Sequence, residues 1–152
     1  MTSLDWGILP RFTSYVRGMG DGRVLCENDA SELEDGSFSF PSERVLERAI
    51  DTVFSFSGTV RFVGHAGMLN LPVSAPEVTV AGDRCTLTIP DPDDGSRLVF
   101  ATGGLSRGEN TRVLCAELIL EEDGSELFFY RYPAGFPLAP LRINLDRQDT
   151  PL

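Results

Sequence analysis

The only histidine of the chain lies in a short segment with a glycine at each end, Gly64-His65-Ala66-Gly67. Glycine tolerates positive φ at little steric cost, so this segment is typical of a tight turn. An imidazole there could ligate a heme iron, orient another ligand by hydrogen bonding, or be an ordinary hydrogen-bonded turn residue. The residues alone leave these three roles open, although the lack of a second histidine argues against a mononuclear zinc or iron site.

Other residues with reactive or metal-binding side chains form no recognisable motif. Cys26, Cys85 and Cys115 lie far apart and are odd in number, so at least one thiol must stay unpaired within the chain. Each lies in an apolar or strand-like context, and we expect all three to be small buried hydrophobic residues rather than nucleophiles. The acidic segments 91–94 and 121–123 do not have the ligand spacing of an EF-hand, so we expect solvated turns there. No GxSxG, P-loop or strand-linked GxGxxG motif is present.

The strand pattern around His65 indicates how the histidine is positioned. Between Phe54 and Phe62, apolar residues or glycine alternate with polar residues, which predicts a half-buried strand. Apolar segments at 68–73 and 77–80 follow and predict further strands. We therefore expect His65 at a turn where two strands meet.

The remaining segments predict an all-β fold, an antiparallel β-sandwich or barrel-like domain with one or two short helices. Residues 12–16 fit a short strand or one turn of helix, and a serine cap with apolar residues at helical spacing predicts a helix over 42–50. Further strands are predicted at residues 23–26, 37–40 (ended by Pro41), 85–89, 98–101, 112–120 and 127–132, with a proline-rich corner after the last.

Size and charge restrict the class of protein. The 152 residues, 41% of them hydrophobic, predict one domain over 1–152 with its own core. A net charge of -10 disfavours nucleic acid and anionic membranes as partners, and no apolar stretch is long enough for a membrane segment. Because the N-terminus lacks the features of a signal peptide, we expect a cytoplasmic chain, or an extracellular or cell-surface one if this domain is excised from a longer protein.

Several stretches of the chain resemble one known family, in the family's order. They are Leu4-Asp5-Trp6-Gly7, Phe12-Thr13-Ser14-Tyr15-Val16, residues 56–71 (FSGTVRFVGHAGMLNL), residues 75–78 (APEV), and Tyr132-Pro133-Ala134-Gly135 with Leu138-Ala139-Pro140-Leu141. Together they resemble the HtaA-domain family of actinobacterial heme-binding proteins over about residues 4–145, with GTVRFVGHAG the most specific block. The resemblance implies a β-rich domain that binds ferric heme (iron protoporphyrin IX) through a tyrosine phenolate.

Carried onto this chain, the resemblance implies Tyr15 as the axial ligand of the heme iron. It implies that His65 is hydrogen-bonded to the phenolate oxygen rather than bonded to iron. Arg11, four residues before Tyr15, is our candidate for a propionate contact, although the family tends to carry a small polar residue at that position. Tyr132 and Phe136 are candidates for stacking on the porphyrin or, equally, core residues.

A phenolate favours ferric iron, so such a site suits capture and transfer of heme rather than oxygen chemistry. We therefore expect a heme-binding protein, not an enzyme, that acts in heme trafficking, uptake or sequestration, with other heme carriers or receptors as partners. A non-heme interaction or structural module of the same fold is the first alternative. Heme-dependent turnover, such as peroxidase activity or heme degradation, is the second, and the lack of another histidine to act as acid or base counts against it. The oligomeric state stays open, a dimer included.

Overall fold

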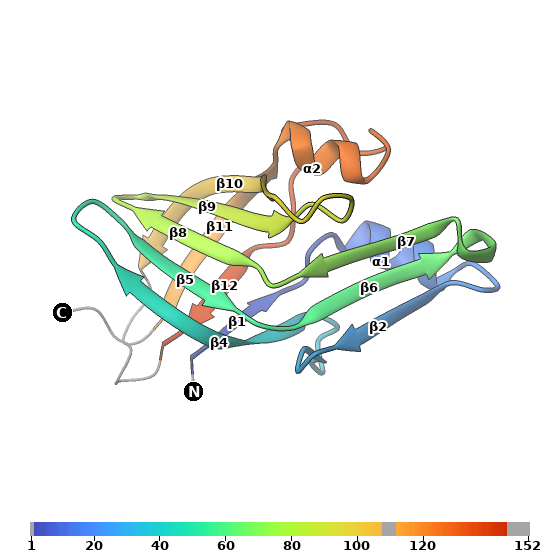
Figure 1. The fold of residues 1–152 in the computed structure, drawn as a ribbon, viewed down its shortest axis with the longest axis horizontal. Helices are drawn as coiled ribbons and strands as arrows, with labels where there is room; N and C mark the ends of the chain where they lie inside the picture. Colours follow the sequence, from blue (N-terminus) through green and yellow to red (C-terminus); the bar gives the residue numbers. More distant parts are fainter. Residues whose placement is uncertain (1, 108–111, 146–152) are drawn as a thin grey trace.

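The computed structural model describes residues 2–107 and 112–145, so part of the predicted domain 1–152 lies outside the described residues. The predicted all-β class is confirmed, with two short helices among the strands (Figure 1). Because the first strand pairs with both the last strand and the fourth, one sheet closes into an antiparallel, barrel-like ring. In ring order its strands are β1 (Ser3–Trp6), β12 (Leu141–Asn144), β11 (Arg112–Leu120), β10 (Arg97–Arg107), β9 (Arg84–Pro90), β8 (Glu77–Ala81), β5 (Thr52–Phe56) and β4 (Phe38–Glu47).

A second, three-stranded sheet extends from one end of this ring. It consists of β2 (Arg23–Glu27), β6 (Thr59–Gly64) and β7 (Leu69–Ser74), with β6 in the middle. The short strand β3 (Ser31–Glu32) pairs with β4. Strands β6 and β7 form a hairpin that projects away from the ring, and its far end carries the 3₁₀ turn η1 (His65–Gly67). The predicted turn between two strands is thus confirmed.

Helix α1 (Pro10–Arg17) settles the open choice for residues 12–16 in favour of a helix. Pro10 occupies the first turn, where its missing N–H costs nothing and its fixed φ suits a helix. The helix packs on the second sheet through Phe12, whose ring lies 5.0 Å from that of Phe62 on β6. Helix α2 (Glu122–Leu127) packs against β10. Neither helix, within the described residues, is long and apolar enough to cross a membrane.

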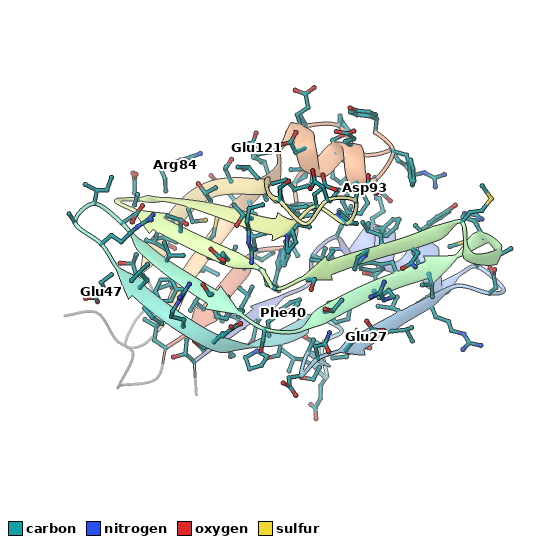
Figure 2. All side chains as sticks on the ribbon, in the orientation of Figure 1. Glu27, Phe40, Glu47, Arg84, Asp93 and Glu121 are labelled. Carbon is teal, nitrogen blue, oxygen red and sulfur yellow. The ribbon has the colours of Figure 1, made fainter. Side chains whose placement is uncertain are left out.

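The core runs from the ring to α1. Trp6, Phe40 and Phe100 are fully buried inside the ring, whereas charged side chains such as Glu47 and Arg84 project outward (Figure 2). The rings of Trp6 and Phe100 meet edge to face with centroids 5.8 Å apart. Burial of these aromatic side chains stabilises the closed sheet, and the second sheet and α1 pack at one end of it.

The predicted helix over 42–50 is wrong, and so is the predicted strand end at Pro41. Strand β4 continues through Pro41 to Glu47 and pairs with β5, with Val45 opposite Phe54. A register shift between Ser42 and Arg44 breaks the alternation of side chains. That irregularity produces the helix-like spacing of apolar residues, and pairing with β5 overrides the local helix preference.

The predicted single strand from Phe54 to Phe62 is interrupted at Ser57–Gly58, so β5 belongs to the ring and β6 to the second sheet. Gly58 has φ +111°, and a Cβ there would lie 2.8 Å from the Cβ of Ala30. The bend therefore requires glycine for both its conformation and its space.

The predicted strand over 127–132 and the predicted turn at 121–123 are also wrong. Helix α2 occupies residues 122–127, and the chain then turns at Phe129 (φ +56°) and Tyr130 (φ +58°). Positive φ is incompatible with a strand. The aromatic run thus divides into a buried Phe128 and Tyr132 and an exposed Phe129 and Tyr130.

Candidate functional site

Tyr15 and His65 are in direct contact although 50 residues separate them in the chain. Tyr15 is on the last turn of α1, and His65 begins the turn η1 at the end of the β6–β7 hairpin. The Tyr15 Oη and His65 Nε2 atoms are 3.0 Å apart, a hydrogen-bond distance in which the direction of donation depends on the histidine tautomer. Helix α1 and the second sheet position these two side chains together.

The His65 turn has an unusual backbone. His65 (φ +51°), Ala66 (φ +56°) and Gly67 (φ +90°) all adopt left-handed conformations. Gly64, by contrast, is extended with φ 172°, and its lack of a side chain instead makes room for the Met19 side chain, which would lie 2.7 Å from a Cβ there. Left-handed conformations at non-glycine residues cost free energy and persist only where surrounding contacts hold them.

Asp21 provides such a contact. Its Oδ2 accepts a hydrogen bond of 2.7 Å from the Ala66 N–H, so the loop after α1 is tied to the turn that carries His65. This hydrogen bond is the main reason that the pKa of the Asp21 carboxyl lies below its ordinary value. The loops after Tyr15 and around His65 are thus bonded to each other.

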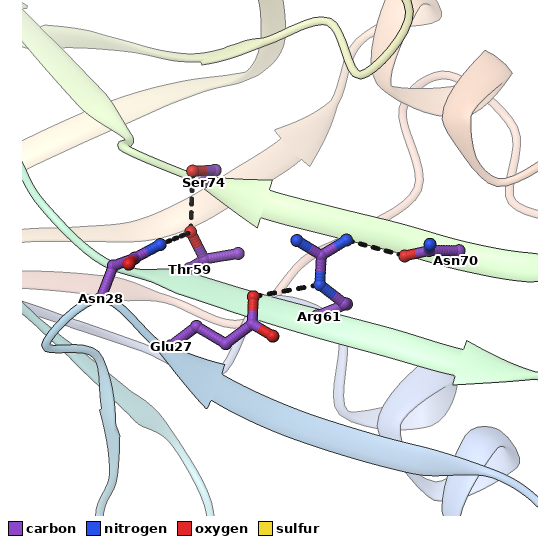
Figure 3. Close-up of polar contacts among 6 residues, drawn as sticks. All are labelled: Glu27, Asn28, Thr59, Arg61, Asn70 and Ser74. Carbon is purple, nitrogen blue, oxygen red and sulfur yellow. Dashed lines mark hydrogen bonds and ion pairs between the residues drawn. The ribbon is translucent and has the colours of Figure 1, made fainter.

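The outer face of the second sheet carries a polar network that joins all three strands (Figure 3). Arg61 on β6 donates to Glu27 on β2 at 3.0 Å and to Asn70 on β7 at 2.8 Å. Thr59 and Ser74 are hydrogen-bonded at 2.8 Å. These cross-strand contacts stabilise the hairpin that presents His65.

A cavity of about 530 Å³ opens beside the Tyr15–His65 pair. The side chains that line it are mostly apolar. Two large hydrophobic residues among them are nevertheless exposed to solvent, Met68 at 86% and Phe129 at 79%. Exposed large apolar side chains around a hollow mark a binding surface. The lining residues are Phe12, Tyr15, His65, Met68, Leu69, Leu127, Phe128, Phe129 and Arg131.

Arg131 lines the same cavity and contacts Tyr15. Its guanidinium carbon lies 4.4 Å from the centroid of the Tyr15 ring. A hydrogen bond to Tyr15 raises the pKa of Arg131 above its ordinary value. Sequence reasoning missed this residue because a strand was predicted there, although the aromatic run around it was a signal that could have directed attention to it.

Three residues predicted for the site lie outside the cavity lining. Arg11 is exposed, and its guanidinium lies 5.8 Å from the Phe136 ring rather than in the cavity lining. Tyr132 is buried in the core at 5.6 Å from Phe128, and Phe136 packs on Tyr132 at 5.0 Å between ring centroids. The structure therefore brings together Tyr15 and His65 but not Arg11, Tyr132 or Phe136.

A neighbouring cavity of about 680 Å³ shares Met68, Leu69, Leu127 and Phe129 with the first but is lined by four acidic side chains. Its turn at 91–94 is held by its own carboxylates, with Asp91 accepting from the Asp93 N–H at 2.8 Å. No group of three or more His, Cys, Asp or Glu residues that could hold a metal ion occurs in the described part of the chain. The two cavities therefore differ in character, since the Tyr15 cavity is mainly apolar and its neighbour is partly acidic.

The cysteines lie away from the cavity. Cys85 and Cys115 are buried as predicted, whereas Cys26 is exposed, which contradicts the prediction for it. A hydrogen bond with Cys115, together with burial, raises the pKa of the Cys85 thiol. A protonated thiol is a poor nucleophile, so Cys85 is a structural residue.

Comparison with known proteins identifies the family of this fold and site. A family model described as Htaa matches residues 1–144. The chain belongs to the HtaA family. Comparison with curated proteins found no match.

Solved structures of similar fold come from Corynebacterium glutamicum. The C-terminal domain of HtaA is 24% identical with a TM-score of 0.80, over 95% of this chain and 94% of that domain. The N-terminal domain of HtaA is 20% identical with a TM-score of 0.76, over 95% and 97%. The heme binding protein HtaB is 21% identical with a TM-score of 0.74, over 95% and 92%. These similarities establish the shared architecture.

Proposed function

We propose that this protein binds ferric heme in the cavity beside Tyr15 and His65, with the Tyr15 phenolate as the axial ligand of the iron. The observation that carries the proposal is the 3.0 Å contact between Tyr15 Oη and His65 Nε2 at the wall of an apolar cavity. Membership of the HtaA family and similarity in fold to a heme binding protein support it.

The residues present fit heme better than a bare metal ion. One phenol oxygen and one imidazole are too few ligands for an isolated ion, whereas a porphyrin supplies four nitrogen ligands of its own. The apolar walls formed by residues such as Phe12, Leu69 and Phe128 suit the faces of a porphyrin ring. Heme, when bound, would supply a ferric centre that accepts an anionic oxygen ligand.

His65 has a separate task in this proposal. A neutral imidazole with its proton on Nε2 donates a hydrogen bond to the phenolate oxygen, which fixes the direction of the Tyr15 side chain. The hydrogen bond seen between the two side chains already has the length this role requires. His65 thus orients the ligand rather than bonding to iron.

We assign the protein to heme trafficking, uptake or sequestration, with other heme carriers or receptors as partners. No second histidine exists in the sequence to act as acid or base, which disfavours peroxidase chemistry. The apolar rim of Met68 and Phe129 is exposed, so it suits transfer between proteins.

The test is a titration of the purified protein with ferric heme, followed by visible absorption. A saturable shift of the Soret band at one heme per chain is expected. Absence of a shift would favour the non-heme alternative, an interaction module of the same fold. Incubation of the loaded protein with peroxide or reductant tests the enzyme alternative, and we expect no turnover.

A further inference from the structure

Among the residues that the structure describes, Arg131 is the one arginine that lines the Tyr15 cavity. Four other arginines pair with carboxylates at 2.5–3.1 Å, namely Arg17, Arg48, Arg61 and Arg97. Within residues 2–107 and 112–145, no carboxylate forms such a pair with Arg131, whose guanidinium instead lies against the Tyr15 side chain. An arginine without a carboxylate partner at the edge of an apolar cavity is available to the carboxylate of a ligand.

The position of Arg131 places it within reach of a ligand at Tyr15. Its guanidinium lies over the Tyr15 ring at 4.4 Å, and both residues line the same cavity. The side chain is exposed and long, so it can turn from the ring toward the cavity mouth without a change in the backbone.

The net negative charge of the protein makes the positive charge of Arg131 significant for binding an anionic ligand. The chain carries 23 acidic and 13 basic residues, and four acidic side chains line the adjoining cavity. An anionic ligand would therefore approach against a negative potential unless a local positive charge offset it. A guanidinium also pairs with a carboxylate through two parallel hydrogen bonds, which fixes the ligand's orientation.

We propose that Arg131 binds a carboxylate group of the tetrapyrrole in the Tyr15 cavity, and that it thereby selects carboxylate-bearing porphyrins over neutral ones. This inference rests on the proposed function. It assigns to Arg131 the propionate contact that the sequence suggested for Arg11, which lies outside the cavity lining.

The experiment compares iron-free protoporphyrin IX with its dimethyl ester, which has the same ring but no free carboxylate. Binding is followed by porphyrin fluorescence for the wild type, Arg131→Met and the matched control Arg11→Met. We expect Arg131→Met to weaken binding of protoporphyrin IX by about threefold to tenfold, as for a partly exposed bidentate pair. Binding of the dimethyl ester should be unchanged in Arg131→Met, and Arg11→Met should bind both porphyrins as the wild type does.

Equal loss for both porphyrins in Arg131→Met would overturn the inference, because Arg131 would then act on Tyr15 or on packing alone. Unchanged binding in Arg131→Met, or the same selective loss in Arg11→Met, would overturn it too. Because the porphyrins contain no iron, the result does not depend on the Tyr15–iron bond. Failure of that bond therefore leaves this comparison intact. A wild type that binds neither iron-free porphyrin but shifts the Soret band of ferric heme would overturn this inference and leave the proposed function standing, whereas a wild type that also gives no shift with ferric heme refutes the proposed function itself.

Discussion

At the residue scale, the candidate site depends on one contact between two polar side chains at an apolar cavity. Tyr15 is half-buried on α1, while His65 is exposed on η1, and only the fold brings them to 3.0 Å. Phe12, one turn before Tyr15, packs on Phe62 and Phe128 and so fixes the helix that carries the tyrosine. Core packing of Phe12 therefore positions the helix that carries Tyr15, and the hydrogen bond to His65 orients the Tyr15 hydroxyl.

We expect His65→Ala to bind heme about 10-fold to 100-fold more weakly than the wild type, because loss of an outer hydrogen bond to a metal ligand has effects of this size. Heme binding should persist, since Tyr15 remains. His65→Gln is the matched control, because its amide N–H can still donate to the phenolate, and it should bind more tightly than His65→Ala. Wild-type affinity in His65→Ala would contradict the role assigned to this residue.

At the element scale, the loop after α1 and the turn η1 act as one unit. Asp21 accepts from Ala66, and the Met19 side chain packs against Gly64. The polar network of Arg61 ties the hairpin to β2, which follows directly from that loop. These contacts hold the left-handed His65 and Ala66 in place.

Asp21→Ala is expected to loosen the His65 turn and to weaken heme binding, while Asp21→Asn, whose amide oxygen can still accept from Ala66, should be closer to the wild type. In a His65→Ala background, Asp21→Ala should add no further loss, because Asp21 acts through His65. Nuclear magnetic resonance of the His65 ring in the ligand-free protein gives a readout independent of heme. An additional loss in the double variant would show that Asp21 acts elsewhere.

The pH dependence of this contact follows from the lowered pKa of Asp21. A depressed folded-state pKa stabilises the fold above the unfolded value, about 3.9 for aspartate, and that contribution is lost as pH falls through the folded value. The turn should therefore stay ordered at neutral pH and loosen only below about pH 4.

Gly22→Ala should destabilise the fold by about 1–3 kcal/mol, because a Cβ at this position would lie 1.7 Å from the Val16 carbonyl oxygen. Gly20→Ala is the control in the same loop, since no heavy atom lies within 4 Å of a Cβ there. Urea unfolding monitored by circular dichroism measures both. Equal stability of the two variants would contradict the close approach of this loop to α1.

Sequence reasoning succeeded for elements with unbroken alternation and failed where the backbone is irregular. The β6–β7 hairpin and its histidine turn follow from the period of two and from Gly67. The helix prediction over 42–50 was wrong because the bulge after Ser42 spaces the apolar residues as in a helix. The strand is recognised only from its pairing with β5. The strand predicted over 127–132 was wrong because the residue types do not indicate the positive φ of Phe129 and Tyr130.

The same distinction holds for the site. The family resemblance named Tyr15 and His65, and the fold brings them together. Arg131 could not be found by residue type, since its contact with Tyr15 spans 116 positions of chain (131 less 15) and depends on the turn after α2. Arg11 was suggested by its spacing on α1, but its side chain leaves that helix toward Phe136.

At the scale of the whole molecule, one continuous core joins the ring, the second sheet and the cavity. Phe100 on β10 contacts Trp6 on β1 and Phe128 after α2, with ring centroids 5.8 Å and 5.9 Å away. Phe128 in turn lines the cavity. Stability of the ring and shape of the site are therefore coupled.

Phe100→Ala should lower the free energy of unfolding by about 3–5 kcal/mol, the usual cost of removing a fully buried phenylalanine. Fluorescence of Trp6, the only tryptophan, reports the transition. Ile50→Ala is the control, because its side chain is 84% exposed and a change of less than about 0.5 kcal/mol is expected. A stability of Phe100→Ala close to that of the control would contradict a single shared core.

The most direct test of the account is a ferric heme titration of Tyr15→Phe beside the wild type, with absorption spectra of both complexes. Tyr130→Phe is the matched control, because Tyr130 is 62% exposed and does not line the Tyr15 cavity. We predict that Tyr15→Phe loses the visible bands of a phenolate-bound ferric heme and at least 10-fold to 100-fold of affinity, by the scale of metal-site substitutions, while Tyr130→Phe behaves as the wild type. An unchanged spectrum and affinity in Tyr15→Phe would contradict the assignment of Tyr15 as the iron ligand.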